Sequence, residues 1–239
     1  MLEIIMLPIL EDNYCYILKS PDGPCAVLDP GDEKPVINLL ENAGWQPDYI
    51  LITHHHWDHV NGIKGIKDKY GAQVYVPEGD AKKIKIYDHT LKDGDIFELG
   101  SETAKIIATP GHTMGEICFY FEGSKAIFTG DTLFAMGCGR LFEGSYEDMF
   151  ISMQKLKELP DETKIYCGHE YTLSNARFCN DYAPDNAHIE KRLKDVIGLR
   201  QEDKPTIPTT IDLEKKTNLF LMAETEDEFA KIRKAKNSF

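Results

Sequence analysis

The sequence predicts a mixed α/β fold that ends in a small helical unit, and three observations carry this prediction. Short apolar runs typical of buried strands recur between residues 1 and 167 and fall into two β-rich halves. Amphipathic helical segments lie between these runs. After about residue 172 only helical patterns remain, interrupted by a proline-rich linker at 205–208. We therefore expect two stacked sheets flanked by helices in a domain at 1–172, and a small helical domain at 173–239.

The first β-rich half begins as an antiparallel meander, because a Pro-Asp-Gly-Pro turn separates two of its apolar runs. Asp29 ends the meander, either as a turn residue or as an acid that supports a nearby site. Glycine follows the first helical segment at position 44 and stops it. The expected elements are strands at 1–7, 13–18, 25–28, 49–52 and 73–76, and helices at 33–43 and 63–70.

The second half repeats the strand pattern and then gives way to helices. A glycine-rich loop at 133–145 contains Arg140, and long loops of this kind are often functional. The segment 147–159 keeps its apolar residues at helical spacing and stops before Pro160. The expected strands are 96–99, 105–108, 117–121, 126–129 and 164–167, and the C-terminal helices are 173–181, 186–199 and 226–236.

Four of the eight histidines lie in the stretch Thr-His-His-His-Trp-Asp-His at 53–59. The stretch follows the apolar run 49–52, so it sits on a loop at the C-terminal end of a strand, where open sheets place their ligand sites. In an extended loop alternate side chains share a side, so His54, His56 and Asp58 can converge. A local turn would bring His59 to them, while the remaining His55 and Trp57 would point away and pack. Neutral imidazole is the commonest protein ligand for metals, so we favour a metal site over a solvated polar loop.

Three later strand ends each deliver one further donor after a glycine. They are Pro-Gly-His-Thr at 110–113, Thr-Gly-Asp-Thr at 129–132 and Cys-Gly-His-Glu at 167–170, which supply His112, Asp131 and His169. With the first cluster these make seven donors. One metal needs three or four protein ligands, so seven suit two metals with one bridging carboxylate.

These motifs resemble the metallo-β-lactamase superfamily, and several longer stretches resemble its glyoxalase II (hydroxyacylglutathione hydrolase) family. The longer stretches are the histidine cluster, Gly-Cys-Gly-Arg-Leu-Phe-Glu-Gly at 137–144, Tyr-Cys-Gly-His-Glu-Tyr-Thr at 166–172, Pro-Thr-Ile-Pro-Thr-Thr at 205–210 and Arg-Lys-Ala-Lys-Asn-Ser-Phe at 233–239. The resemblance covers essentially the whole chain. It implies an αβ/βα four-layer sandwich with a small C-terminal helical domain.

The resemblance also implies how two divalent metals would be held. One metal would bind three histidines, the other would bind Asp58 and two histidines, and Asp131 would bridge them, so both carboxylates would also serve catalysis. Paired metals lower the pKa of a shared water toward ~7, which would make a metal-bound hydroxide the nucleophile. Zinc suits such mixed ligands best, and iron or manganese is also compatible. The implied ligand sets are His54, His56 and His112 for the first metal and Asp58, His59 and His169 for the second.

The implied substrate is the thioester of S-(2-hydroxyacyl)glutathione, typically S-D-lactoylglutathione, whose hydrolysis to glutathione and a 2-hydroxy acid ends methylglyoxal detoxification. The family's substrate contacts fall here on Arg140, Phe142, Tyr171, Arg233 and Lys236. Arg140 stands where lysine is frequent, and Phe142 stands where some members have tyrosine. Arg233 and Lys236 are three residues apart on an expected helix and share a face, although a solvated basic surface is the alternative for this tail.

Charge and cysteine usage limit the partners and the compartment. The net charge is −13, which disfavours nucleic acid and anionic membranes as partners. No apolar run approaches the ~18 residues of a membrane span, and the N-terminus lacks a basic region and a cleavage site. The six cysteines form no Cys-x-x-Cys and are expected to be reduced packing groups. We expect a cytoplasmic monomer whose partner is the small glutathione thioester.

Other functions are compatible with parts of the pattern. A mono-iron persulfide dioxygenase has an overlapping ligand motif, but the Gly-Cys-Gly-Arg loop and the basic tail favour the hydrolase. The same two features make a lactonase or a β-lactamase less favoured. A non-catalytic metal-binding module of the same fold would not need the complete ligand set. A nucleic-acid phosphodiesterase fits two metals but not the charge. We expect the remaining His89 and His188 to be surface or structural residues.

Overall fold

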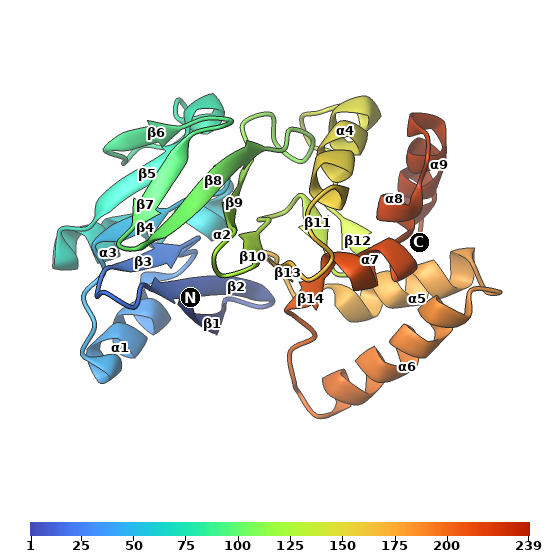
Figure 1. Cartoon of the computed structure of the whole chain (residues 1–239), viewed down its shortest axis with the longest axis horizontal. Coiled ribbons are helices and arrows are strands. Elements are labelled where there is room, and N and C mark those ends of the chain that lie inside the picture. Colours follow the sequence, from blue (N-terminus) through green and yellow to red (C-terminus); the bar gives the residue numbers. More distant parts are fainter.

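The computed structural model describes all 239 residues and places two six-stranded sheets face to face, with helices outside each sheet (Figure 1). The first sheet contains β1 (Glu3–Ile9), β2 (Asn13–Lys19), β3 (Cys25–Leu28), β4 (Tyr49–Leu51), β5 (Gln73–Pro77) and β6 (His89–Leu91) in this spatial order. β1 to β3 form the expected antiparallel meander, whereas β3 to β6 run parallel. The helices of this half are α1 (Glu33–Ala43), the short α2 (Trp57–Val60), α3 (Ile63–Tyr70) and a 3-10 turn, η1 (Glu78–Asp80).

The second sheet has the spatial order β14–β13–β10–β9–β8–β7. Its strands are β7 (Ile96–Leu99), β8 (Glu102–Ala108), β9 (Ile117–Phe121), β10 (Ala126–Phe128), β13 (Lys164–Tyr166) and β14 (Thr209–Thr210). Only β10 and β13 pair parallel. A two-stranded ribbon of β11 (Leu133–Phe134) and β12 (Gly137–Cys138) lies in the glycine-rich loop.

The remaining helices gather on the far side of the second sheet (Figure 1). They are α4 (Tyr146–Lys157), α5 (Thr172–Tyr182), α6 (Ala187–Gln201), α7 (Ile211–Thr217), α8 (Leu219–Met222) and α9 (Glu226–Asn237). None of these or the earlier helices combines the length and the apolar character that a membrane crossing requires.

The alternation of side chains along β2 shows how the layers are built. Tyr16 and Leu18 point into the core between the two sheets, whereas Cys15 and Ile17 point into the core beneath α1 and α3. Because successive strand residues face opposite sides, the middle of β2, from Tyr14 to Leu18, must be apolar to be buried on both faces. A third core joins the second sheet to α4 and the C-terminal helices. The predicted four-layer α/β sandwich with a C-terminal helical region is confirmed.

Two local expectations were wrong. Strands do not cease after residue 172, because β14 returns to the second sheet and pairs with β13. Residues 57–60 form α2 rather than an extended loop, so alternation along the chain ends at His56, the N-cap of that helix. The division into domains at 172 and 173 stays a prediction. All six cysteines are buried and unpaired, as expected for packing groups.

Candidate metal centre and substrate pocket

Glycines at strand ends let the donor-bearing loops approach one another. Gly130 follows β10 with φ of +46°, and a Cβ there would lie 2.6 Å from Thr53 Oγ1. A Cβ on Gly168, after β13, would lie 2.4 Å from Asp131 Oδ1. Contacts this short exclude any side chain at either position, so the loops after β4, β10 and β13 meet only because these residues are glycine.

Three histidines from two loops form one compact group. His54 Nε2 lies 3.1 Å from His56 Nδ1, and His112 Nε2 lies 3.0 Å from the same atom. His54 is fully buried and His112 is almost so. The three ring nitrogens therefore converge on one point, the arrangement expected of the predicted first ligand set.

A second group joins one carboxylate to two histidines. Asp58 Oδ2 lies 3.4 Å from His169 Nε2 and 3.6 Å from His59 Nε2. The turn that brings Asp58 and His59 together is α2, which presents both from the first residues after His56. The structure thus also brings together the three residues predicted for the second metal.

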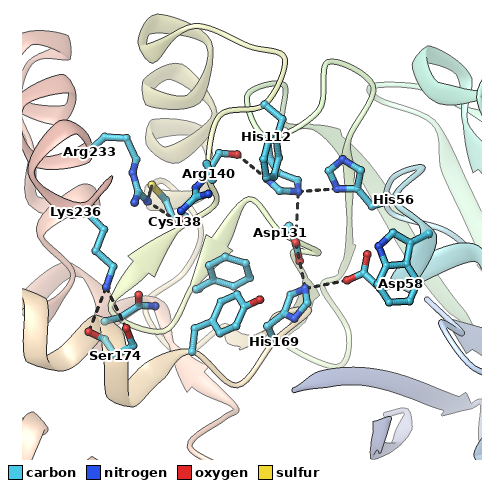
Figure 2. Close-up of a pocket in the computed structure, with 15 residues that line it drawn as sticks. His56, Asp58, His112, Asp131, Cys138, Arg140, His169, Ser174, Arg233 and Lys236 are labelled. Carbon is cyan, nitrogen blue, oxygen red and sulfur yellow. Dashed lines mark hydrogen bonds and ion pairs between the residues drawn. The ribbon is translucent and has the colours of Figure 1, made fainter. Parts of the chain in front are cut away.

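Asp131 lies between the two groups (Figure 2). Its Oδ2 is 3.4 Å from His112 Nε2 and 3.2 Å from His169 Nε2. Its Oδ1 is 3.5 Å from His59 Nε2. One carboxylate therefore faces both groups, which is the geometry that a bridging ligand needs.

Two buried polar atoms at this centre have no hydrogen-bond partner, namely His59 Nε2 and Asp131 Oδ1. An unsatisfied buried polar atom costs about 1–3 kcal/mol, so a protein rarely leaves two of them side by side. Cations placed among the seven donors would satisfy both atoms. The residues present fit a pair of metal ions.

In four of the five histidines of the centre, the ring nitrogen that faces away from it is held by an acceptor, which is typical of metal-binding histidines. Carboxylates hold two of them, a hydroxyl holds one and a backbone carbonyl holds one. The pairs are His59 Nδ1 with Asp29 Oδ2 at 3.0 Å, His169 Nδ1 with Asp12 Oδ1 at 2.8 Å, His54 Nδ1 with Thr53 Oγ1 at 3.0 Å, and His112 Nδ1 with Arg140 O at 2.7 Å. Asp29, for which the sequence left two roles open, supports the site: it also accepts hydrogen bonds from Thr53 N and Thr53 Oγ1.

The pKa shifts separate the two histidine groups. Burial lowers the pKa of His54 and of His112, and it lowers the pKa of His56 to about 4. These three rings are therefore neutral at neutral pH, the form in which imidazole binds metals.

The second group behaves in the opposite way. Burial alone would lower the pKa of His169, but Asp131 and Asp12 outweigh burial and raise it to about 9. Burial is likewise outweighed at His59, where Asp131 and Asp29 raise the pKa. In return, His169 and His59 hold the pKa of Asp131 well below its usual range despite its burial. Before metal binds, His169 is therefore protonated at neutral pH and forms charged pairs with Asp131 and Asp12.

A pocket of about 650 Å³ opens over the centre and reaches the C-terminal helix (Figure 2). Five of the seven donors line it, and His54 and His59 lie beneath them. Every residue predicted to contact substrate also lines it: Arg140, Phe142, Tyr171, Arg233 and Lys236.

The basic tail is not a solvated surface at Arg233. Only 5% of this residue is exposed, and Arg233 Nη1 donates to Cys138 O at 2.9 Å. Lys236 Nζ donates to Ser174 O at 3.2 Å, which ties α9 to α5. Both cations are thereby held at the pocket wall.

The expectation that Trp57 packs away from the site was wrong. The indole is 62% exposed and lines the pocket, because α2 turns it toward the rim. His55 does point away from the centre, toward the buried Asp80 at 2.8 Å.

Two family models together match almost the whole chain. Residues 9–169 match the model of the metallo-beta-lactamase superfamily, and residues 170–239 match the model described as hydroxyacylglutathione hydrolase C-terminus. A hydroxyacylglutathione hydrolase of Pelagibacter ubique (strain HTCC1062) is 45% identical over 100% of both chains. Another, of Methylococcus capsulatus, is 46% identical over 97% of this chain and 91% of its own length. The chain belongs to the hydroxyacylglutathione hydrolase family.

Solved structures support the fold of this hydroxyacylglutathione hydrolase family member. The BLEG-1 B3 metallo-beta-lactamase has a TM-score of 0.71 at 24% identity, over 92% of this chain and 100% of its own. The ETHE1 protein from Myxococcus xanthus has a TM-score of 0.73 at 21% identity, over 98% of this chain and 90% of its own. At such identities the likeness concerns the fold alone.

Sequence reasoning missed several residues that support the site of this family member. Asp12, which holds His169, lies in the turn between β1 and β2. Asn13 is the first residue of β2, and its Nδ2 donates to Asp58 Oδ2 at 2.8 Å. Glu116 is fully buried, and its Oε1 accepts from Asp131 N at 2.7 Å. No motif marks these residues. Only the pairing of distant strands places them beside the donors.

Proposed function

We propose that this protein hydrolyses the thioester of S-(2-hydroxyacyl)glutathione, with S-D-lactoylglutathione as the leading substrate, to glutathione and a 2-hydroxy acid. One observation carries the proposal: a single pocket joins the His/Asp centre to three cationic side chains, Arg140, Arg233 and Lys236. The names of the full-length relatives point to the same reaction. In a cell the reaction would complete methylglyoxal detoxification in the cytoplasm, carried out by a monomer.

The proposed metals are two divalent ions, zinc first, with iron or manganese as alternatives. Bound there, such ions would supply Lewis acidity for the carbonyl and activate a water molecule. His54, His56 and His112 would hold one ion, Asp58, His59 and His169 the other, and Asp131 both.

Asp58 is oriented for its proposed role by the chain itself. Asn13 Nδ2 donates to Asp58 Oδ2, the oxygen that also faces His169 and His59. The hydrogen bond fixes the carboxylate rotamer at the edge of the pocket. Asp131 is fixed through its backbone by Glu116 in the same way.

A covalent mechanism on a cysteine is disfavoured. Cys138 lines the pocket, but burial raises the pKa of its thiol to about 11. The thiol is therefore protonated at neutral pH and is a poor nucleophile. Activated water suits a thioester well, because the departing thiol has a parent pKa of ~8.5 and leaves without a strong general acid.

Two aromatic side chains wall the proposed reaction site. The ring of Tyr171 stacks on His169 with centroids 4.6 Å apart, and the ring of Phe142 meets His112 edge-on at 5.2 Å. Both rings line the pocket that the three cations also line. Glutathione carries two carboxylates, so its peptide body suits the cationic end while its thioester lies at the centre.

The proposal is tested by following the loss of thioester absorbance with S-D-lactoylglutathione, with and without a chelator. We expect rapid hydrolysis that the chelator abolishes and added zinc restores. Hydrolysis that survives complete metal removal would refute the proposal. One iron per chain without thioester hydrolysis would instead support the persulfide dioxygenase alternative, and a metal-free, inactive protein would support a non-catalytic module.

A further inference from the structure

A fully buried carboxylate outside the seven donors, Asp80, contacts both loops that carry the three-histidine group. Asp80 Oδ2 lies 2.8 Å from His55 Nδ1 and accepts a hydrogen bond from His55 N at 3.2 Å. The same oxygen accepts from Thr113 Oγ1 at 3.0 Å. His55 stands between the donors His54 and His56, and Thr113 follows the donor His112.

The topology of the first sheet explains why an aspartate is found there. β3, β4 and β5 are parallel neighbours, and the loop with the histidine cluster follows the central strand β4. Asp29 follows β3 and holds Thr53 and His59, at the two ends of this loop. Asp80 follows β5 and holds His55, in its middle. One buried aspartate after each flanking strand thus accepts hydrogen bonds from the loop.

The loop that carries His112 is fitted closely against Asp80. A Cβ on Gly115 would lie 2.4 Å from Asp80 Oδ1, and a Cβ on Gly79 would lie 2.7 Å from the Gly115 Cα. Both glycines are therefore required for the approach. The contact is built by the fold and is not a chance surface encounter.

A second set of contacts connects Asp80 to the loop that bears Arg140 and Phe142. Lys83 Nζ donates to Glu143 Oε1 at 2.5 Å and lies 3.6 Å from Asp80 Oδ1. Glu143 Oε2 accepts from Met114 N at 2.9 Å. This layer is more exposed than Asp80, so we expect it to contribute less.

We propose that Asp80 is a positioning residue that sets the spacing of His54, His56 and His112, and thereby the affinity of one half of the centre for its metal ion. The inference rests on the proposed function only in taking these histidines as metal ligands. The other half depends on different carboxylates, because His169 and His59 are held by Asp12 and Asp29. Asp29 also reaches His54 through Thr53, but it makes no hydrogen bond to the loop of His112. Loss of Asp80 should therefore weaken one half and spare the other.

The test compares Asp80→Ala with Asp12→Ala, using wild type as reference. Removing a support behind metal ligands typically lowers metal affinity roughly 10- to 100-fold. We expect Asp80→Ala, after dialysis against a weak chelator, to keep about one metal per chain where wild type keeps two. Diethyl pyrocarbonate labelling mapped by mass spectrometry then identifies the empty half: His56 and His112 react in Asp80→Ala, whereas His169 reacts in Asp12→Ala.

Two milder variants keep the test decisive if Asp80→Ala does not fold. Thr113→Val removes one hydroxyl and should expose the same two histidines to a smaller degree. Asp80→Asn keeps an acceptor oxygen and should restore most of the metal content. Lys231→Ala, on the exposed face of α9, is the control and should match wild type.

The inference is overturned if Asp80→Ala, or Thr113→Val in its place, retains two metals with wild-type labelling, or loses both halves equally. The proposed function fails separately, if wild type holds two metals in this pattern but does not hydrolyse the thioester.

Discussion

Asp131 Oδ2 lies 3.2 Å from His169 Nε2, and the same oxygen lies 3.4 Å from His112. These two histidines lie in separate loops of the second sheet, His112 after β8 and His169 after β13. A single carboxylate therefore connects the two ligand groups directly. The account of this centre depends on that connection.

Asp131→Ala should lower kcat/KM for S-D-lactoylglutathione at least about 100-fold and reduce the bound metal, because both groups lose a shared ligand. Metal analysis and the thioester assay measure the two effects together. Asp68→Asn, an exposed carboxylate on α3, serves as the matched control and should leave both values unchanged. Full activity in Asp131→Ala would show that this carboxylate bridges nothing.

The double variant Arg233→Ala, Lys236→Ala should mainly raise KM, by roughly 100-fold, since two charge-assisted contacts worth about 1.5 kcal/mol each are lost. The kcat should change little, because neither cation approaches the His/Asp centre. Arg233 also bonds Cys138 O and lies over the ring of Phe220, so truncation costs packing as well. Arg233→Lys with Lys236→Ala separates the two effects, and unchanged kinetics in both variants would remove α9 from the substrate site.

Phe142→Tyr should lower KM about 2- to 10-fold, because a new hydroxyl at the pocket rim can gain a hydrogen bond worth ~0.5–1.5 kcal/mol. Phe142 is 60% exposed, so the added oxygen meets no buried apolar surface. Steady-state kinetics with the glutathione thioester give the result. A higher KM would mean that the ring contacts an apolar part of the substrate.

Metal loading should release protons at pH 7.5. The pKa of His169 is raised to about 9, so this ring is protonated at pH 7.5 in the metal-free protein. A ligand nitrogen must lose its proton to bind a metal, so loading should release the His169 proton, with less release as the pH rises toward 9. The pKa of His59 is also raised, so any proton that His59 holds adds to this release. The three rings of lowered pKa release none.

Calorimetric titration of metal in two buffers of different ionisation enthalpy counts these protons. His169→Ala should release about one fewer than wild type. Equal release by both proteins would contradict the pairing of His169 with its two carboxylates.

Most of the fold follows from local pattern. The helices Glu33–Ala43 and Ile63–Tyr70 and the strands Cys25–Leu28 and Ile117–Phe121 have the predicted bounds. Each is marked by apolar periodicity and by a turn or capping residue at its end. These signals are local, and sequence alone is enough to place such elements.

The elements that were missed depend on tertiary contacts. β14 has only Thr209 and Thr210, and it is a strand only because β13 offers a free edge. α2 begins at Trp57 within a stretch whose histidine spacing is equally compatible with an extended loop. Segments of two to four residues are too short to show a hydrophobic periodicity. Packing against the rest of the fold, rather than local propensity, therefore decides their structure.

The residues of the site also divide into those that local sequence patterns predict and those that only the structure shows. The seven candidate donors carry local signals, namely the histidine cluster and the three strand–glycine motifs, and they lie together in the structure. Asp12, Asp80 and Glu116 carry no local signal. Each becomes visible only when its hydrogen-bond partner, up to 157 residues away for Asp12, is known. Supports of this kind have to be read from a structure.

Titration of metal-free protein with zinc, with thioester hydrolysis measured after each addition, tests the central claim most directly. The account predicts that activity against S-D-lactoylglutathione rises to a plateau at two zinc ions per chain and that Asp131→Ala shows no such rise. A plateau at one ion per chain, or the absence of hydrolysis with two ions bound, would contradict it.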